Sequence, residues 1–298
     1  MNKEYRNIYA ATILKDGRFA ISCGYHNCDN IIIYDNKTFE PNLKIELNHY
    51  GIYNLNLLSS NILVACVKGG IILYIIKKKS YEVFQTINKE RYDFYYIMKL
   101  SNKRLISRSR KEEYHCIIIY YEKNNKYSED YIFINNDGFG NQIIQTKENE
   151  ICYSKQKEKS NDIKKILCFF DLLERKQIKE IDICLCNGNQ SMNMITKNLL
   201  LLAQLNSFFL INIDQYNIIS QIEVKENNSY FTCLCLLNEN MILTGDTEGA
   251  IKQWKIEGNE ITLFSSKHIA HNGRITTILK LGEGRILSCG YGGEFKIW

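Results

Sequence analysis

Two thirteen-residue segments near the C-terminal end of the chain repeat one another, and this repeat limits the possible folds more than any other feature. Residues 242–254 read ILTGDTEGAIKQW, and residues 286–298 read ILSCGYGGEFKIW. Each opens on Ile-Leu, has a hydroxyl residue third and a glycine eighth, and closes on a tryptophan. The two tryptophans, Trp254 and Trp298, lie 44 residues apart. A period of this length indicates an array of one supersecondary unit.

Each copy has the pattern of a β-hairpin. A short apolar strand leads into a polar turn that contains glycine, and a second apolar strand ends on an aromatic residue. The unit recurs at 62–74 (ILVACVKGGIILY) and, with two extra loop residues, at 20–34 (AISCGYHNCDNIIIY). Strands that are apolar throughout are expected to be buried on both faces. No segment shows a helical period, so the sequence predicts an all-β fold.

The residue that closes the hairpin can be followed along the whole chain at intervals of 40 to 50 residues. An apolar strand precedes each hairpin, and a more polar strand follows all but the last, as an exposed sheet edge requires. The sequence therefore predicts one domain of seven four-stranded units. Their approximate boundaries are 1–47, 48–90, 91–135, 136–185, 186–227, 228–270 and 271–298.

This pattern resembles the WD40 repeat, in which each period of about 40–45 residues encodes one four-stranded blade of a β-propeller. The resemblance is most specific in the two C-terminal repeats, and it implies a seven-bladed WD40-like propeller. It also implies structural roles for four residues. His271, Ser288 and Trp298 would belong to the buried Asp–His–Ser/Thr–Trp network of that family, and Trp254 would pack between strands and blades. The family's usual aspartate is missing from the turn at 291–293.

The last unit stops where its outer strand is expected to begin. Only residues 1–7 precede the first inner strand near Ile8, and a strand alone usually takes about 5–6 residues. We therefore expect the last blade to have three strands and an open edge. Such an edge invites a further strand from the natural chain, from a partner or from a second copy, and we favour a chain that continues.

The sequence indicates no catalytic, cofactor or metal site. The chain has 5 histidines, but none forms an H-x-x-x-H pair, and the glycines at 138 and 140 lack the third glycine of a phosphate-binding loop. No Ser/His/Asp order or paired carboxylates stand out. We expect a protein that is not an enzyme and that needs no cofactor.

Cysteine usage and the distribution of apolar residues bear on location. The 11 cysteines have no regular spacing and lie mostly in apolar runs, where cysteine acts as a small buried hydrophobe. This usage is typical of a reducing compartment, so we expect an intracellular, cytoplasmic protein. The most apolar stretch, 198–213, is too short and too polar to span a bilayer.

A basic cluster lies in NKRLISRSRKEEY, residues 102–114. Alternation along a strand places Arg108 and Arg110 on one side of a strand end, where two guanidinium groups can clamp a phosphate or an acidic peptide. The simpler alternative is a solvated hairpin in which the basic residues pair with Glu112 and Glu113.

Two functions from different classes remain open. The favoured one, implied by the resemblance, is a non-catalytic scaffold that binds proteins or peptides, including acidic or phosphorylated ones, through propeller loops. Tyrosine and arginine make effective anchors in such surfaces. The candidate anchors are Tyr25, Tyr50, Tyr92, Arg108, Arg110, Tyr230 and Tyr291. The alternative is a module that binds RNA or phospholipid through residues 103–111. Because the net charge is only +5 over 298 residues, a nucleic-acid partner is disfavoured.

Overall fold

The computed structural model describes residues 7–23, 29–47, 51–124, 126–135, 139–159, 162–184, 190–224 and 229–298. Within these ranges the chain forms β-strands and no helix. The strands are β1 (Ile8–Ile13), β2 (Phe19–Cys23), β3 (Asp29–Tyr34), β4 (Pro41–Leu47), β5 (Ile52–Leu57), β6 (Ile62–Ile76), β7 (Tyr81–Lys99), β8 (Arg104–Lys111), β9 (Tyr114–Lys123), β10 (Lys126–Asn135), β11 (Phe139–Lys147), β12 (Glu150–Lys159), β13 (Asp162–Asp171), β14 (Lys176–Cys184), β15 (Gln190–Thr196), β16 (Leu199–Gln204), β17 (Ser207–Asn212), β18 (Asn217–Glu223), β19 (Phe231–Asn238), β20 (Met241–Asp246), β21 (Ile251–Glu257), β22 (Glu260–Lys267), β23 (Ile275–Lys280), β24 (Ile286–Gly290) and β25 (Phe295–Ile297).

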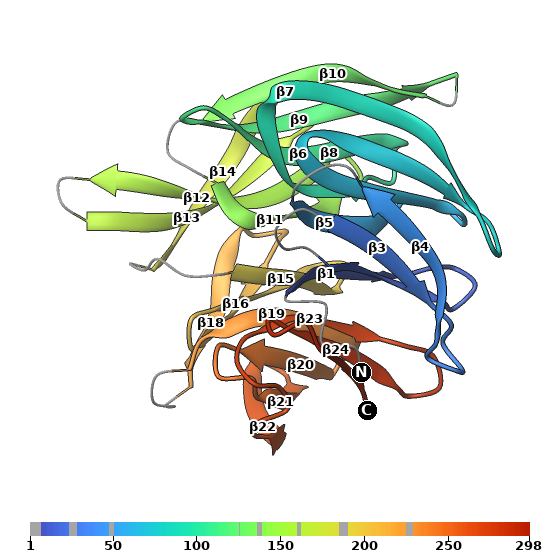
Figure 1. Cartoon of the computed structure of the whole chain (residues 1–298). Coiled ribbons are helices and arrows are strands. Elements are labelled where there is room, and N and C mark those ends of the chain that lie inside the picture. The colour runs from blue at the N-terminus through green and yellow to red at the C-terminus, as the bar shows by residue number, and fades with distance from the viewer. Residues whose placement is uncertain are drawn as a thin grey trace. The chain divides into compact units, whose positions relative to one another are not determined.

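Neighbouring strands in sequence are neighbours in space, so each sheet is a simple meander (Figure 1). The described strands form six sheets: β1–β4, β5–β10, β11–β14, β15–β18, β19–β22 and β23–β25. We number them first to sixth in this order. The fold is an all-β β-propeller with six blades, and the prediction of seven blades was wrong. The sixth sheet has three strands among the described residues, the number expected for the last blade.

The error lies in the second sheet, where two expected blades form one sheet of six strands. The sequence predicted a boundary near residue 90, but β7 runs through it from Tyr81 to Lys99. It pairs with β6 on one side and with β8 on the other. No glycine or proline occurs between Gly70 and Gly138, so nothing in this segment forces the chain to leave the sheet.

The chain divides into two compact units. The first contains residues 1–134 and 279–298, and the second contains residues 135–278. In the first unit, one end of the chain packs against the other. Ile8, Phe19 and Ile21 of the first sheet share a buried cluster with Leu287 and Cys289 of the sixth. Burial of such side chains contributes about 25 cal/mol for each Å² of apolar surface removed from water.

Four strands, β1, β5, β7 and β19, carry the same irregularity. The pairing register with the next strand shifts across Tyr9 in β1, Tyr53 in β5, Tyr95 in β7 and Thr232 in β19. A β-bulge at this point inserts one unpaired residue and turns its side chain away from the regular alternation. Three of these four bulged residues are tyrosines of the first unit.

A basic side chain links neighbouring sheets at several points. In the first unit Arg18, which follows the turn residue Gly17, donates to the main-chain oxygens of Lys77 at 3.2 Å and Lys78 at 3.1 Å. Arg285, which follows Gly284, donates to the main-chain oxygen of Asn36 at 3.0 Å. Both glycines have positive φ, 89° and 77°. These links give main-chain carbonyl groups at strand ends a hydrogen-bond partner from the neighbouring sheet.

Each of the two C-terminal tryptophans donates a hydrogen bond to a hydroxyl residue of the preceding strand. Trp254 Nε1 donates to Thr244 Oγ1, and Trp298 Nε1 donates to Ser288 Oγ, each at 2.8 Å. Trp254 is buried, at 3% exposed, whereas Trp298 is 40% exposed. His271 is also buried, and its main-chain N–H donates to the oxygen of Gly249 at 3.0 Å.

Candidate functional site

The structure separates the residues that the sequence proposed as anchors. Tyr25 and Tyr50 lie outside the described residues. Tyr92, Arg108 and Arg110 lie in the second sheet. Tyr291 lies in the turn between β24 and β25. Tyr230 precedes β19 in the second unit, where it is 47% exposed and its N–H donates to Thr247 Oγ1 at 3.1 Å.

Arg108 and Arg110 share a group of polar and aromatic residues near the end of β8. We call this group the Arg108 cluster: Tyr53, Asp93, Tyr95, Arg108, Arg110 and His115. The Arg108 guanidinium carbon lies 5.3 Å from the centre of the Tyr95 ring, within range of a cation–π interaction. Arg110 Nη2 lies 3.7 Å from Asp93 Oδ2, and Tyr95 donates to the same oxygen at 3.5 Å.

Arg108 is the unusual member of this cluster. Its Nε is buried, and within the described residues this atom has no hydrogen-bond partner and the side chain has no ion pair. Burial lowers the pKa of Arg108 to about 10, with Tyr95 opposing the effect and Arg110 adding to it. The guanidinium therefore stays charged at neutral pH. A cation that is partly removed from water and has no counter-ion is unfavourable, and such sites are candidates for binding an anion.

The neighbours of Arg108 confirm that the local field is positive. Burial lowers the pKa of His115, and both Arg108 and Arg110 lower it further. Arg110 is 48% exposed, and its contact with Asp93 is long for an ion pair, so it remains accessible. The cluster thus has one partly buried and one exposed arginine, with a single carboxylate beside the exposed one.

An aromatic contact extends the cluster from β7 to β5. The Tyr53 ring centre lies 5.0 Å from that of Tyr95 with the planes tilted by 55°, and Tyr53 is 36% exposed. Tyr92 does not join them. Its ring packs against Phe94 at 6.1 Å, with the ammonium groups of Lys89 and Lys111 over it at 4.8 and 5.6 Å. Tyr92 is therefore part of the packing of the sheet.

Arg18, a buried arginine of the first unit, provides a contrast. Arg18 lies at a cavity of 520 Å³ that is lined by strand-end turns of the first and second sheets. It donates to Asn42 Oδ1 and to the main-chain oxygens of Lys77 and Lys78, and it pairs with Asp16 at 2.7 Å. Because its donors are already used, Arg18 offers no seat for an anion, unlike Arg108.

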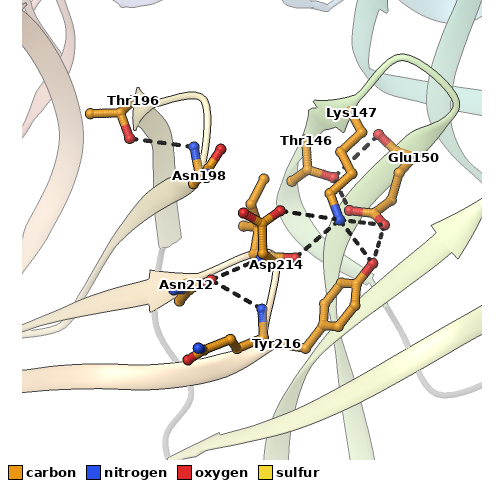
Figure 2. A network of polar contacts seen from close by, with 10 residues as sticks. Thr146, Lys147, Glu150, Thr196, Asn198, Asn212, Asp214 and Tyr216 are labelled. Carbon is orange, nitrogen blue, oxygen red and sulfur yellow. Dashed lines mark hydrogen bonds and ion pairs between the residues drawn. The ribbon is translucent and has the colours of Figure 1, made fainter.

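Figure 2 shows a polar network in the second unit that the sequence did not suggest. Lys147 Nζ donates to the main-chain oxygen of Ile213 and to Tyr216 Oη, each at 3.2 Å. Glu150, 5% exposed, accepts from Tyr216 at 2.5 Å and from Thr146 at 2.6 Å. Burial disfavours the charge on Lys147, but the Tyr216 hydrogen bond and nearby carboxylates outweigh it and raise its pKa. A network with its charges paired holds the third and fourth sheets together.

A buried ion pair in the fifth sheet was also missed. Asp246 Oδ2 lies 3.1 Å from Lys252 Nζ, and both side chains are nearly inaccessible. Ser229 donates to the same carboxylate at 2.6 Å, and the N–H groups of Glu248 and Ala250 donate to its other oxygen. The sequence contained one indication of this ion pair: an aspartate stands at the start of a glycine-containing turn, and a lysine follows inside an apolar strand.

Three further findings bear on the class of site. Among the described residues no three histidine, cysteine, aspartate or glutamate side chains converge in a way that would hold a metal ion. Within the same ranges no helix has the length and apolar character needed to cross a bilayer. No protein-family model matches the chain, and no curated protein matches it in sequence.

Proposed function

We propose that the chain is a non-catalytic interaction platform that binds an acidic or phosphorylated segment of a partner protein at the Arg108 cluster. The observation that carries the proposal is the partly buried Arg108 side chain, whose buried Nε has no hydrogen-bond partner in the described part of the chain. An anionic ligand would supply the missing counter-ion. The β-propeller fold supports the proposal, since its rigid sheets hold loops in place for binding, and binding needs no catalytic residues.

The two arginines suit one anion. Guanidinium groups bind carboxylate and phosphate through two parallel hydrogen bonds, and such charge-assisted bonds are about twice as strong as neutral ones. Tyr95 holds Arg108 in place from one side. Arg110 is exposed and only loosely held by Asp93, so it can turn toward an incoming ligand.

The alternative of an RNA or phospholipid partner bound through residues 103–111 has less support. Those basic residues do not form one continuous surface. Lys111 lies over the Tyr92 ring, whereas Arg108 lies over the Tyr95 ring. Lys103 is in the turn before β8, at the other end of that strand from Arg110. A nucleic acid needs a continuous basic face.

The test is a panel of fluorescent peptides carrying phosphoserine, glutamate or serine at one central position, read by anisotropy. We expect the wild-type chain to bind anionic peptides. Arg108→Met should weaken binding roughly 30-fold or more, since loss of one partner of a buried charge pair costs about 2–5 kcal/mol. Lys103→Met is the matched control, because it makes the same change in charge at the far end of β8.

Stability separates this role from a structural one. Removing a partly buried cation that lacks a counter-ion should leave the melting temperature of Arg108→Met unchanged or raised. If Arg108→Met instead unfolds, or if it binds the anionic peptides as well as Lys103→Met does, the proposed function is wrong.

A further inference from the structure

We infer that the ligand is an extended peptide with one anionic residue seated at Arg108, and that its adjoining residues lie along a row of tyrosines. This inference rests on the proposed function and extends it to the chemistry of the partner. The row consists of Tyr95, Tyr53, Tyr9 and Tyr291, all in the first unit.

The row follows from the recurring bulge. Tyr95, Tyr53 and Tyr9 are the residues across which the register shifts in β7, β5 and β1. Strands β1 and β5 contact one another along their length. Bulges redirect a side chain and are frequent beside binding sites. On each of these three strands, the residue at the bulge is a tyrosine.

Ring contacts are present at both ends of the row. Tyr53 lies 5.0 Å from Tyr95, whose ring carries Arg108. At the other end, the Tyr9 ring meets Tyr291 edge to face at 6.3 Å and 87°. One pair of rings, Tyr95 and Tyr53, thus lies beside Arg108, and a second pair, Tyr9 and Tyr291, lies at β1, the strand that contacts β5.

These rings are accessible. Tyr9 is 37% exposed, Tyr53 is 36% exposed and Tyr291 is 48% exposed. Tyrosine gives a large, stiff contact surface with little loss of conformational entropy, which is why binding surfaces use it heavily. Proline and aromatic side chains of an extended peptide pack well on such surfaces.

The distribution of charge favours a peptide over a nucleic acid. Strand β1 reads IYAATI and β5 reads IYNLNL, so neither contains a lysine or an arginine. A single-stranded nucleic acid brings a phosphate with every base and needs basic groups along the whole track. Here the arginines stand only at one end, which suits a ligand with a single anion.

The test is a peptide library with a fixed phosphoserine and randomised flanking positions, accompanied by a fixed-glutamate library and a labelled ten-nucleotide uridine RNA. We expect the wild-type chain to select proline or aromatic residues at positions beside the phosphoserine. Tyr53→Ala should lose this selection, with affinity for the selected peptide falling roughly three- to tenfold, while binding still depends on the anion. Tyr121→Ala is the control, since Tyr121 is 49% exposed and stands at the far end of β9.

The possible outcomes are distinct. Loss of selection in Tyr53→Ala alone supports the inference. Unchanged selection in that variant overturns the tyrosine row but leaves the anion seat at Arg108 intact. Binding of the uridine RNA that is tighter than peptide binding and sensitive to Arg108→Met overturns the peptide in favour of a nucleic acid. If neither library binds, the proposed function fails as well.

Discussion

Trp254 and Trp298 close equivalent repeats and make the same hydrogen bond, yet their burial differs. Trp254 is 3% exposed and packs against Phe208 at 5.1 Å, while Trp298 is 40% exposed. We expect Trp254→Ala to lower the free energy of unfolding by about 3–5 kcal/mol, the usual range for a buried aromatic. Trp298→Ala should cost about half as much or less, because less surface is lost from the core. Urea titration of both variants checks this, and equal losses would contradict the difference in packing.

His115 gives the Arg108 cluster a dependence on pH. Its pKa in the folded chain is lowered by burial and by the two arginines, from a reference near 6.5. The unfolded chain therefore binds more protons as the pH falls below about 6.5, and the stability of the folded state falls with it. We expect the melting temperature to drop on acidification through this range, and the drop to be smaller in His115→Gln. An identical drop in both proteins would place the titrating group elsewhere.

Sequence alternation placed Arg108 and Arg110 on the same side of a strand, and the structure brings them into one cluster. Whether that cluster is a binding site stays a prediction. Alternation could not place Tyr53 and Tyr95, because a bulge interrupts the two-residue period on which such reasoning depends. The available indication was a large apolar residue followed by tyrosine, which occurs at Ile8-Tyr9, Ile52-Tyr53 and Phe94-Tyr95.

At the scale of the element, the basic links between sheets should matter in proportion to their burial. Arg18 is 9% exposed and serves several acceptors, whereas the Arg285 side chain is 27% exposed and reaches one carbonyl of the neighbouring sheet. We expect Arg18→Met to lower the free energy of unfolding by about 2–3 kcal/mol and Arg285→Met by about 1 kcal/mol. Chemical denaturation would show which variant loses more stability. A larger loss in Arg285→Met than in Arg18→Met would mean that these contacts do not stabilise the fold in proportion to their burial.

The hairpins were predictable because both their strands and their turns leave marks in the sequence. The segments 242–254 and 286–298 form β20 with β21 and β24 with β25, with Gly249 and Gly293 at positive φ in the turns. The long strand β7 was not, because the polar residues 88–93 (NKERYD) between its two apolar halves look like a loop between blades, although no glycine or proline marks a turn there. Whether two such strands stay separate or join depends on partners distant in sequence, which a local pattern does not contain.

At the scale of the whole molecule, the charge distribution predicts weak binding to polyanions. The net charge is +5. Arg108 lies over the Tyr95 ring and Lys111 over the Tyr92 ring, so these two cations do not form one basic surface. We expect elution from heparin below roughly 0.3 M salt, because few phosphate-like contacts form at once and each adds to the salt dependence. Retention to much higher salt would favour a nucleic-acid partner and would count against an interaction platform for peptides.

The six-stranded second sheet has a consequence for how the chain opens and closes. Strand β8 is bonded to β7 on one side and to β9 on the other, with two further strands beyond β7 and one beyond β9. Its amide protons should therefore exchange with solvent only when a large cooperative unit opens, and should be among the slowest in the chain. Arg108 therefore lies on a strand that we expect to open rarely. The bulged tyrosines beside it lie where the hydrogen bonds between strands are interrupted, so local opening should be easier there. In hydrogen exchange, a bound ligand should slow the amides around those bulges and leave β8 nearly unchanged.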